Sequence, residues 1–399
     1  MSNNLAPVEI VSEKLEQATK LLNENNVDMW VTFVQETSAG RERVFDYISV
    51  GDLTWESAII ITKSGEKIVI LGKFDEQPFR DSKLYSEMLP YVQDFKEPFL
   101  EILKRFEPKT IALNFSFNDP SADGISYGKY VFLEKTIKET LPSSKIVSAE
   151  EIISGIISQK SAKEIEYIKE AVKITEKIFE EISAFLKVGL TEKEVYDFVQ
   201  KKIAEKGVTP SFETLVFSGD RGDGMGHGMA TENKIMEGDL LHIDMGVFYN
   251  GYASDLQRTW YILRKGETAP PEDAVKGFNT IKDAIIESGK ALKPGAKGFD
   301  IDKISRNKVT SQGYPEYPHA LGHQLGRFVH DGGALLGPNW ARYKNTPFME
   351  LKEGQVFTLE PSLSVKGFGA VGIEEDVIVT KNGAEYLSKL QQQLFLVKS

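Results

Sequence analysis

The chain has 399 residues, of which 41% are hydrophobic and 27% are charged, and its formal net charge at pH 7 is −11. This length exceeds one ordinary hydrophobic core and predicts two domains. The negative charge disfavours nucleic acid and anionic membranes as partners, because both attract cationic surfaces. The sequence contains no cysteine, which excludes disulfides and thiolate ligands, so a bound metal would need oxygen and imidazole ligands.

The first residues, MSNNLAPVEIVSEKLEQ, lack the basic start and apolar run of a signal peptide. No stretch has the number of consecutive apolar residues that a bilayer span requires. We therefore expect a cytoplasmic protein.

The first part of the chain, residues 1–157, alternates short β-rich runs with amphipathic stretches such as residues 14–23. Predicted strands cover residues 29–34, 57–62, 68–71 and 110–114. This alternation is typical of a small α/β domain.

The second part, residues 158–399, begins with helices and continues with strands. A long amphipathic helix is predicted to begin near Ser161, and Thr191 with Glu194 forms a capping box that begins another helix. From about Ser211 the pattern changes to strands and hairpins, with one more helix over residues 274–292.

The most informative segment is LLHIDMGVFY, followed by Asn250-Gly251 and YASDLQRTWYI. Asn-Gly supplies the positive φ angles of a type I′ turn, so this segment predicts a β-hairpin. Asp244 then faces Gln257, and Asp244 and Asp255 are diagonal neighbours on one face. Two carboxylates that close together repel each other unless a cation lies between them. The hairpin therefore predicts a metal site.

Three further ligand candidates follow: His323 in GHQLG, Glu360 in TLEP, and one of the adjacent pair Glu374 and Glu375 in GIEED. Neighbours on a strand point oppositely, and spacing alone does not choose between the last two. Taken singly, the aspartates could be surface charges and the histidine could be structural. Jointly, four carboxylates and one imidazole suit a pair of divalent cations.

The order and spacing of these five residues resemble the pita-bread metallopeptidases: prolidase, aminopeptidase P and methionine aminopeptidase. The segment HALGHQLGRFVHDGG is most similar to the prolidase and aminopeptidase P branch. The resemblance implies a creatinase-like α/β domain over residues 1–157 and an α+β pita-bread catalytic domain over residues 158–399, in a homodimer. It also selects Glu374 over Glu375 as the ligand.

For the metals, the resemblance implies that Asp255 and Glu374 bridge two divalent cations. Asp244 would bind one of them, and His323 with Glu360 the other. Mn²⁺ is favoured, with Co²⁺, Zn²⁺ and Fe²⁺ as alternatives. The implied reaction is attack by a metal-bridging hydroxide on the Xaa-Pro bond of a dipeptide or longer peptide, with Glu360 shuttling the proton.

For the substrate pocket, the resemblance assigns His227 and His330 as donors to the reacting carbonyl, and His319 as a further pocket residue. His242 has no counterpart in the family, and we expect it to be structural. Gly372 stands where this branch usually has arginine, and Arg342 is a candidate replacement. Two other interpretations remain: a non-peptidase hydrolase or lyase on the same scaffold, and a binding module, which the presence of all five ligands disfavours.

Overall fold

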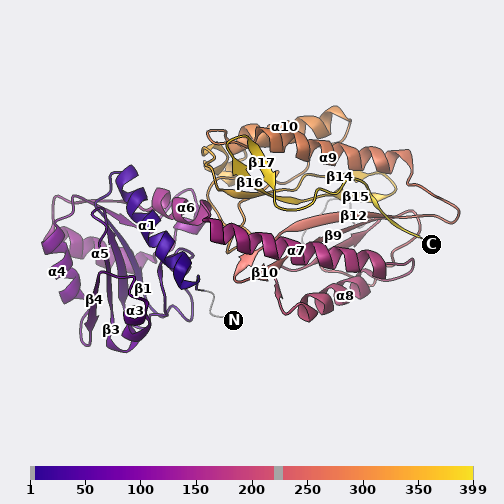
Figure 1. Cartoon of the computed structure of the whole chain (residues 1–399). Coiled ribbons are helices and arrows are strands. Elements are labelled where there is room, and N and C mark those ends of the chain that lie inside the picture. The colour runs from indigo at the N-terminus through magenta and orange to yellow at the C-terminus, as the bar shows by residue number, and fades with distance from the viewer. Residues whose placement is uncertain (1–4, 220–227, 399) are drawn as a thin grey trace. The chain divides into compact units, whose positions relative to one another are not determined.

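The computed structural model describes residues 5–219 and 228–398, and its chain divides into two compact units, Met1–Ser161 and Ala162–Ser399. The predicted boundary between residues 157 and 158 falls inside helix α6 (Glu150–Ser158), just before the observed one. In Figure 1 the first unit runs from indigo to purple and the second from magenta to yellow.

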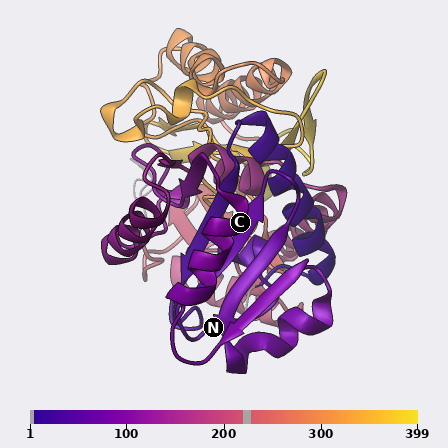
Figure 2. The same ribbon diagram turned by 90° about the vertical axis from the view of Figure 1, so that its left-hand side faces the viewer.

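The first unit contains a six-stranded mixed sheet with the strand order β4-β3-β2-β1-β5-β6. Its strands are β1 (Met29–Val34), β2 (Ser57–Thr62), β3 (Lys67–Gly72), β4 (Glu87–Tyr91), β5 (Thr110–Leu113) and β6 (Lys145–Ser148). Its helices are α1 (Val8–Glu24), α2 (Phe45–Ile48), α3 (Glu76–Ser82), α4 (Lys96–Phe106), α5 (Tyr127–Thr140) and α6. Helices α4 and α5 pack on one face of the sheet, and α1 and α6 lie on the other (Figures 1 and 2).

Burial on both faces explains why the central strands read as continuous apolar runs. Strands β1 and β2 are buried along their whole lengths and pair antiparallel, whereas β1 and β5 pair parallel. Such strands carry β-branched and aromatic residues at every position rather than at alternate ones. The four strands predicted here are confirmed, and so is the α/β class of this unit.

The second unit begins with helices α7 (Ala162–Phe185) and α8 (Glu192–Glu205) and later adds α9 (Glu272–Ala291) and α10 (Gly298–Ser311). Its first strands are β7 (Thr209–Pro210), β8 (Leu215–Ser218), β9 (Leu240–Met245), β10 (Val247–Tyr249), β11 (Tyr252–Ala253) and β12 (Leu256–Ile262). Its later strands are β13 (Val356–Leu359), β14 (Ser362–Val365), β15 (Gly369–Gly372), β16 (Glu375–Thr380), β17 (Gly383–Tyr386) and β18 (Phe395–Val397). In Figure 1 the strands lie between the pair α7 and α8 and the pair α9 and α10. This α+β arrangement confirms the predicted class.

The Asn-Gly hairpin forms as predicted. Asn250 and Gly251 have φ angles of 48° and 78°, as a type I′ turn requires. The pairing of the two strands keeps the same register from the turn outward, so Asp244 pairs with Gln257. A Cβ at Gly246 would lie 1.8 Å from the carbonyl oxygen of Ser254, so only glycine fits there.

Helix α8 confirms the predicted capping box, in which Thr191 and Glu194 each accept from the other's backbone N–H. Helix α10 was not predicted, because its apolar positions are too few for a clear helical period. Its buried Ile301 and Val309 contribute to the core, and a Cβ at Gly298 would lie 1.9 Å from the carbonyl oxygen of Leu335. Close backbone approach, which the sequence pattern does not reveal, places this helix.

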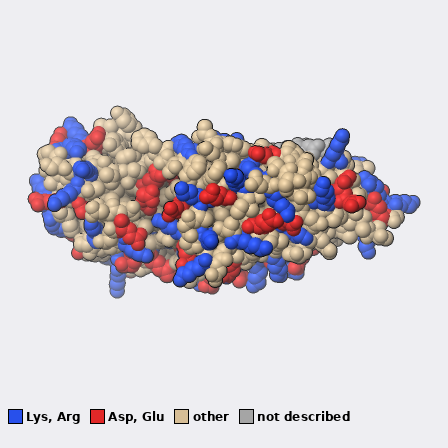
Figure 3. Space-filling view, turned by 90° about the horizontal axis from the view of Figure 1, so that it is seen from above, with Lys and Arg blue, Asp and Glu red and all other residues tan. Residues whose placement is uncertain are grey.

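No helix in the described part of the chain combines the length and apolar character needed to cross a membrane. Acidic and basic side chains are intermingled over the face shown in Figure 3. Many charged side chains of the described helices form pairs within one helix, such as Lys177 with Glu180 at 2.6 Å. That face therefore offers no broad area of one sign to a polyanion.

Candidate metal centre

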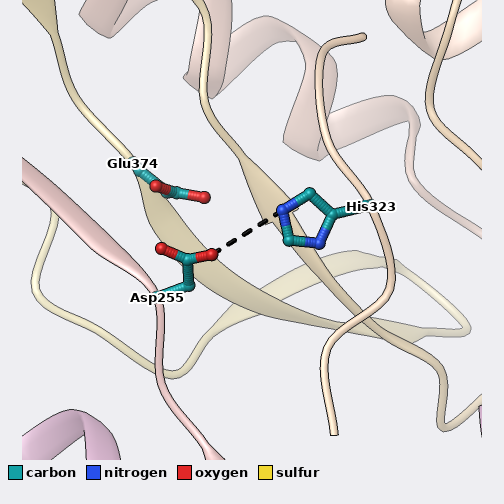
Figure 4. Close-up of side chains that lie close together, drawn as sticks. All are labelled: Asp255, His323 and Glu374. Atoms are coloured by element: carbon teal, nitrogen blue, oxygen red, sulfur yellow. Dashed lines mark ion pairs between the residues drawn. The ribbon is translucent and has the colours of Figure 1, made fainter. Parts of the chain in front are cut away.

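Three ionisable side chains from separate parts of the second unit converge in its interior. Asp255, His323 and Glu374 each offer a ligand atom, and these atoms lie within 4.8 Å of one another. Figure 4 shows the three side chains pointing toward one another, with a dashed line for the 3.7 Å separation of His323 Nε2 and Asp255 Oδ2. This arrangement has the ligand types and the spacing of a divalent metal site.

Backbone hydrogen bonds hold these residues in place. The amide of Glu374 donates to the carbonyl of Gln257 at 3.2 Å, which joins the short link between β15 and β16 to β12. The amide of Thr358 donates to the carbonyl of His323 at 2.9 Å, which joins the histidine segment to β13. The amide of Asp255 donates to the carboxylate of Asp376 at 3.1 Å.

The other two predicted ligands lie beside this group. Glu360 follows β13, and its Oε1 lies 3.3 Å from His323 Nε2. The register of β13 and β16 pairs Leu359 with Glu375, so its continuation sets Glu360 opposite Glu374. Asp244 is close enough to Glu374 for their charges to interact. The structure therefore brings all five predicted ligands together.

The carboxylates are unfavourable neighbours in the absence of a cation. Burial, followed by the charge of Glu374, raises the pKa of Asp244, Asp255 and Glu360 well above the usual range. Burial also raises the pKa of Glu374 to about 7. Burial lowers the pKa of His323 to about 3, which keeps its imidazole neutral and able to bind a metal.

Unsatisfied oxygen atoms show that the residues fit a cation. Asp244 Oδ1, Asp255 Oδ1 and both carboxylate oxygens of Glu374 are buried without a hydrogen-bond partner. Buried carboxylate oxygens are costly unless they bind donors or metals. These acceptors match the hard ligands that divalent cations prefer.

The structure separates the two adjacent glutamates. Glu374 faces the metal-site group, whereas Glu375 lies 3.1 Å from Arg258 NH2 and also accepts from Ser388. Glu375 and Arg258 are 0% and 4% exposed, so they form a buried ion pair. Spacing left open whether Glu374 or Glu375 is the metal ligand. The structure favours Glu374, because neighbouring residues of a strand point to opposite sides and Glu375 points to Arg258.

This pair leads to a stability prediction. Replacing Glu375 with glutamine leaves the Arg258 guanidinium buried without its counter-charge, and should lower the free energy of unfolding by about 3 kcal/mol. Denaturant unfolding would measure this loss. The folded variant should keep its metal, and a variant that loses metal at unchanged stability would contradict the separation of the two glutamates.

A cavity of about 310 Å³ opens beside the metal-site group, lined among others by His319, His323 and His330. The rings of His330 and His323 have centroids 4.1 Å apart, so the predicted catalytic His330 lies at this cavity. Both ring nitrogens of His319 are engaged, with the carbonyl of Ala320 and with Ser362 Oγ, each at 2.8 Å. His319 therefore presents a fixed ring to the cavity.

The two remaining predicted pocket residues are Arg342 and His227. Arg342 donates to the carbonyl of Pro318 at 2.8 Å and lies over Trp340, and it does not line the cavity. Its charge is close enough to His319, which lines the cavity, to interact with that ring. His227 lies outside the described residues.

A buried carboxylate that sequence reasoning missed joins the two ends of the segment that contains residue 227. Glu192 accepts from the backbone N–H of Ser218 at 3.1 Å and of Thr231 at 3.2 Å, and from the side chain of Asn233 at 3.2 Å. Its position in the first turn of α8 also lets it interact favourably with the helix dipole. The tertiary hydrogen bonds show that Glu192 also holds Ser218 and Thr231 close together.

His242 and Gln257 also line the cavity, although we expected His242 to be structural. His242 Nδ1 and Gln257 Oε1 are buried without partners, and burial lowers the pKa of His242 to about 4. One feature of the sequence indicated that His242 lies at the cavity. His242 and Asp244 are two residues apart on one predicted strand, so their side chains share a face.

Comparison with known proteins agrees with this geometry. The sequence profile of metallopeptidase family M24 matches residues 166–381. An uncharacterized peptidase of Staphylococcus haemolyticus is 30% identical over 385 residues, which cover 94% of this chain and 98% of the relative. An X-Pro aminopeptidase from Thermotoga maritima is structurally similar, with a TM-score of 0.69 and 26% identity over 96% of this chain and 99% of that one. An Xaa-Pro dipeptidase from Bacillus anthracis shares the fold, with a TM-score of 0.73 and 24% identity over 97% and 100% of the two chains.

Proposed function

Because the chain belongs to metallopeptidase family M24 and has its pita-bread fold, we propose that it hydrolyses Xaa-Pro peptide bonds with two divalent cations. The single observation that carries the proposal is the convergence of Asp255, His323 and Glu374 on one point beside a cavity. The similarity to X-Pro aminopeptidase and dipeptidase structures supports proline as the residue after the scissile bond.

In this proposal the five converging side chains hold the cations. Asp255 and Glu374 would hold the cations together with Asp244, His323 and Glu360. Mn²⁺ suits this mixture of four carboxylates and one imidazole. When bound, the cations supply Lewis acidity toward water and toward a peptide carbonyl.

The remaining side chains position the peptide and move protons. Glu360 is partly buried and reaches the cavity, where its carboxylate can take a proton from water and pass it to the leaving amine. His330 lies on the same cavity and can donate to the carbonyl oxygen as its negative charge develops. His227 is proposed for the same task from its sequence position.

A peptide panel tests the proposal. Mn²⁺-loaded protein should cleave Xaa-Pro dipeptides or Xaa-Pro-Yaa tripeptides and leave matched Xaa-Ala peptides intact. Chelation should abolish cleavage, and Mn²⁺ or Co²⁺ should restore it, because the carboxylate cluster binds these ions. Product formation is followed by chromatography and metal content by elemental analysis.

His330→Ala serves as the matched variant, because it changes a cavity histidine without removing a proposed ligand. We expect it to keep its metal and to lose most of its turnover. If two cations bind and no peptide in the panel is cleaved, the peptidase proposal is wrong. A non-peptidase reaction at the same centre then becomes the better explanation.

A further inference from the structure

The ring of His319, which lines the cavity, lies between two hydrogen-bond partners. Its Nδ1 is 2.8 Å from the carbonyl oxygen of Ala320, and its Nε2 is 2.8 Å from Ser362 Oγ. A backbone carbonyl can only accept, so Nδ1 carries the proton. The Nε2 of a neutral imidazole then accepts, and the hydroxyl of Ser362 donates to it. The two contacts together assign the Nδ1–H tautomer to His319.

The surroundings of His319 keep the ring neutral, as this tautomer requires. Burial lowers the pKa of His319, and the positive charges of Arg306 and Arg342 lower it further. The backbone is held as well, because Arg306 donates to the carbonyl oxygen of Tyr317 at 2.8 Å and to that of His319. Of the two contacts to the ring, the one from Ser362 comes from a side chain, so a substitution can remove it.

His323 repeats the same local arrangement four residues later. Its Nδ1 lies 3.2 Å from the carbonyl oxygen of Gln324, and its Nε2 lies 3.3 Å from Glu360 Oε1. The Nε2 lone pair of His323 is therefore available to a metal, whereas the hydroxyl proton of Ser362 occupies that of His319. One hydroxyl group thus distinguishes the two rings.

Ser362 also borders a second cavity, of about 210 Å³, whose lining includes Pro318, Leu363 and Ser364. His319 lines the larger cavity beside the metal-site group. The hydrogen bond between Ser362 and His319 therefore lies between the two cavities.

The strand that carries Ser362 is held close to His242, which lines the larger cavity. Ser362 pairs with Gly372 of β15, and β15 packs against β9. A Cβ at position 372 would lie 2.6 Å from His242 Cε1, so only glycine permits this approach. Paired strands, rather than a loop, therefore set the position of the Ser362 hydroxyl.

We propose that Ser362 is a positioning residue, whose hydroxyl holds His319 as a fixed, neutral partition between the two cavities. Without this hydroxyl the Nε2 lone pair loses its donor, and the ring is free to turn toward the second cavity. The larger cavity then loses part of its wall, which weakens the binding of a substrate there. The effect on peptide cleavage rests on the proposed function, whereas the state of the ring does not.

Nitrogen NMR of the full chain with labelled histidines tests the state of the ring. Zn²⁺ is the metal used, because Mn²⁺ is paramagnetic, and His319→Gln identifies the signals of His319. The wild type should show a protonated Nδ1 and an unprotonated Nε2 that accepts a hydrogen bond. Ser362→Ala should move the Nε2 signal to that of a nitrogen without a donor. Ser362→Thr, which restores a hydroxyl, should keep the wild-type signal.

Kinetics with Xaa-Pro peptides test the partition. Ser362→Ala should raise KM by roughly fivefold, as the loss of one hydrogen bond implies, with kcat and metal content close to wild type. Ser364→Ala is the matched control, because it removes a hydroxyl from the same strand and the same second cavity but keeps the bond to His319. It should match the wild type in both the NMR signal and KM.

The results separate this proposal from the peptidase function. A protonated Nε2 in the wild type, or the same Nε2 signal in Ser362→Ala as in the wild type, would overturn the positioning role. A shifted signal with an unchanged KM would also overturn it, because the ring would then not shape the cavity. If the signals behave as expected and no Xaa-Pro peptide is cleaved, the positioning role stands and the peptidase proposal fails.

Discussion

Replacing Asp255 with asparagine should weaken metal binding by more than about a hundredfold, since even residues that only support metal ligands cost up to that amount. Turnover should fall with metal occupancy. The same change should make the metal-free protein more stable than metal-free wild type, because it removes one of four closely spaced, mutually repelling carboxylates. Glu374→Gln should behave in the same way.

Elemental analysis, calorimetric Mn²⁺ titration and thermal unfolding with and without metal would measure these effects. Asp302→Asn is the matched control, because Asp302 is also a buried aspartate but pairs with Arg306 at 2.6 Å. It should lose stability and retain metal. An Asp255→Asn protein that binds metal normally, or that is less stable than wild type without metal, would show that the carboxylates do not form one cluster.

The metal-free protein should lose stability as the pH rises from about 5 to about 8. The pKa of Glu374 is raised to about 7 from 4.5, so the folded state holds a proton that the unfolded state has already released. The stabilisation is complete below about 4.5 and disappears as the pH rises through about 7. For this one group the loss is on the order of 3 kcal/mol.

Denaturant unfolding across this pH range, after exhaustive chelation, would measure how steeply the free energy of unfolding falls with pH. Saturating Mn²⁺ should flatten it, because cations neutralise the ionised carboxylates, and metal-free Glu374→Gln should also be flatter than wild type. Metal-free stability that stays constant or increases over the same range would contradict the raised pKa that burial gives Glu374.

The hairpin shows what local sequence can predict. Asn250 and Gly251 specify the turn, the turn specifies the register, and the register places Asp244 beside Asp255 before any tertiary contact is known. The same reasoning predicted the buried strands of the first unit, whose apolar runs are continuous. In both cases the determining information lies within a few residues.

Contacts between distant parts of the chain were beyond such reasoning. The relation of His242 to Gly372 depends on how β15 packs against β9, so the glycine looked like a simple loss of arginine. Spacing alone did not separate Glu375 from Glu374; the family resemblance favoured Glu374, and the contact of Glu375 with Arg258, which lies on another strand, agrees with that choice. Likewise, α10 is placed by its contacts rather than by its own periodicity.

The hydrogen bonds that Glu192 accepts from Ser218 and Thr231 have a consequence for protein engineering. One carboxylate holds both Ser218 and Thr231, so the two ends of the intervening segment are anchored independently of what lies between them. Loops with fixed ends tolerate changes in length at small entropic cost. With Ser218 and Thr231 held in this way, β8 and α8 should keep their places when the length of the sequence between these two residues is changed.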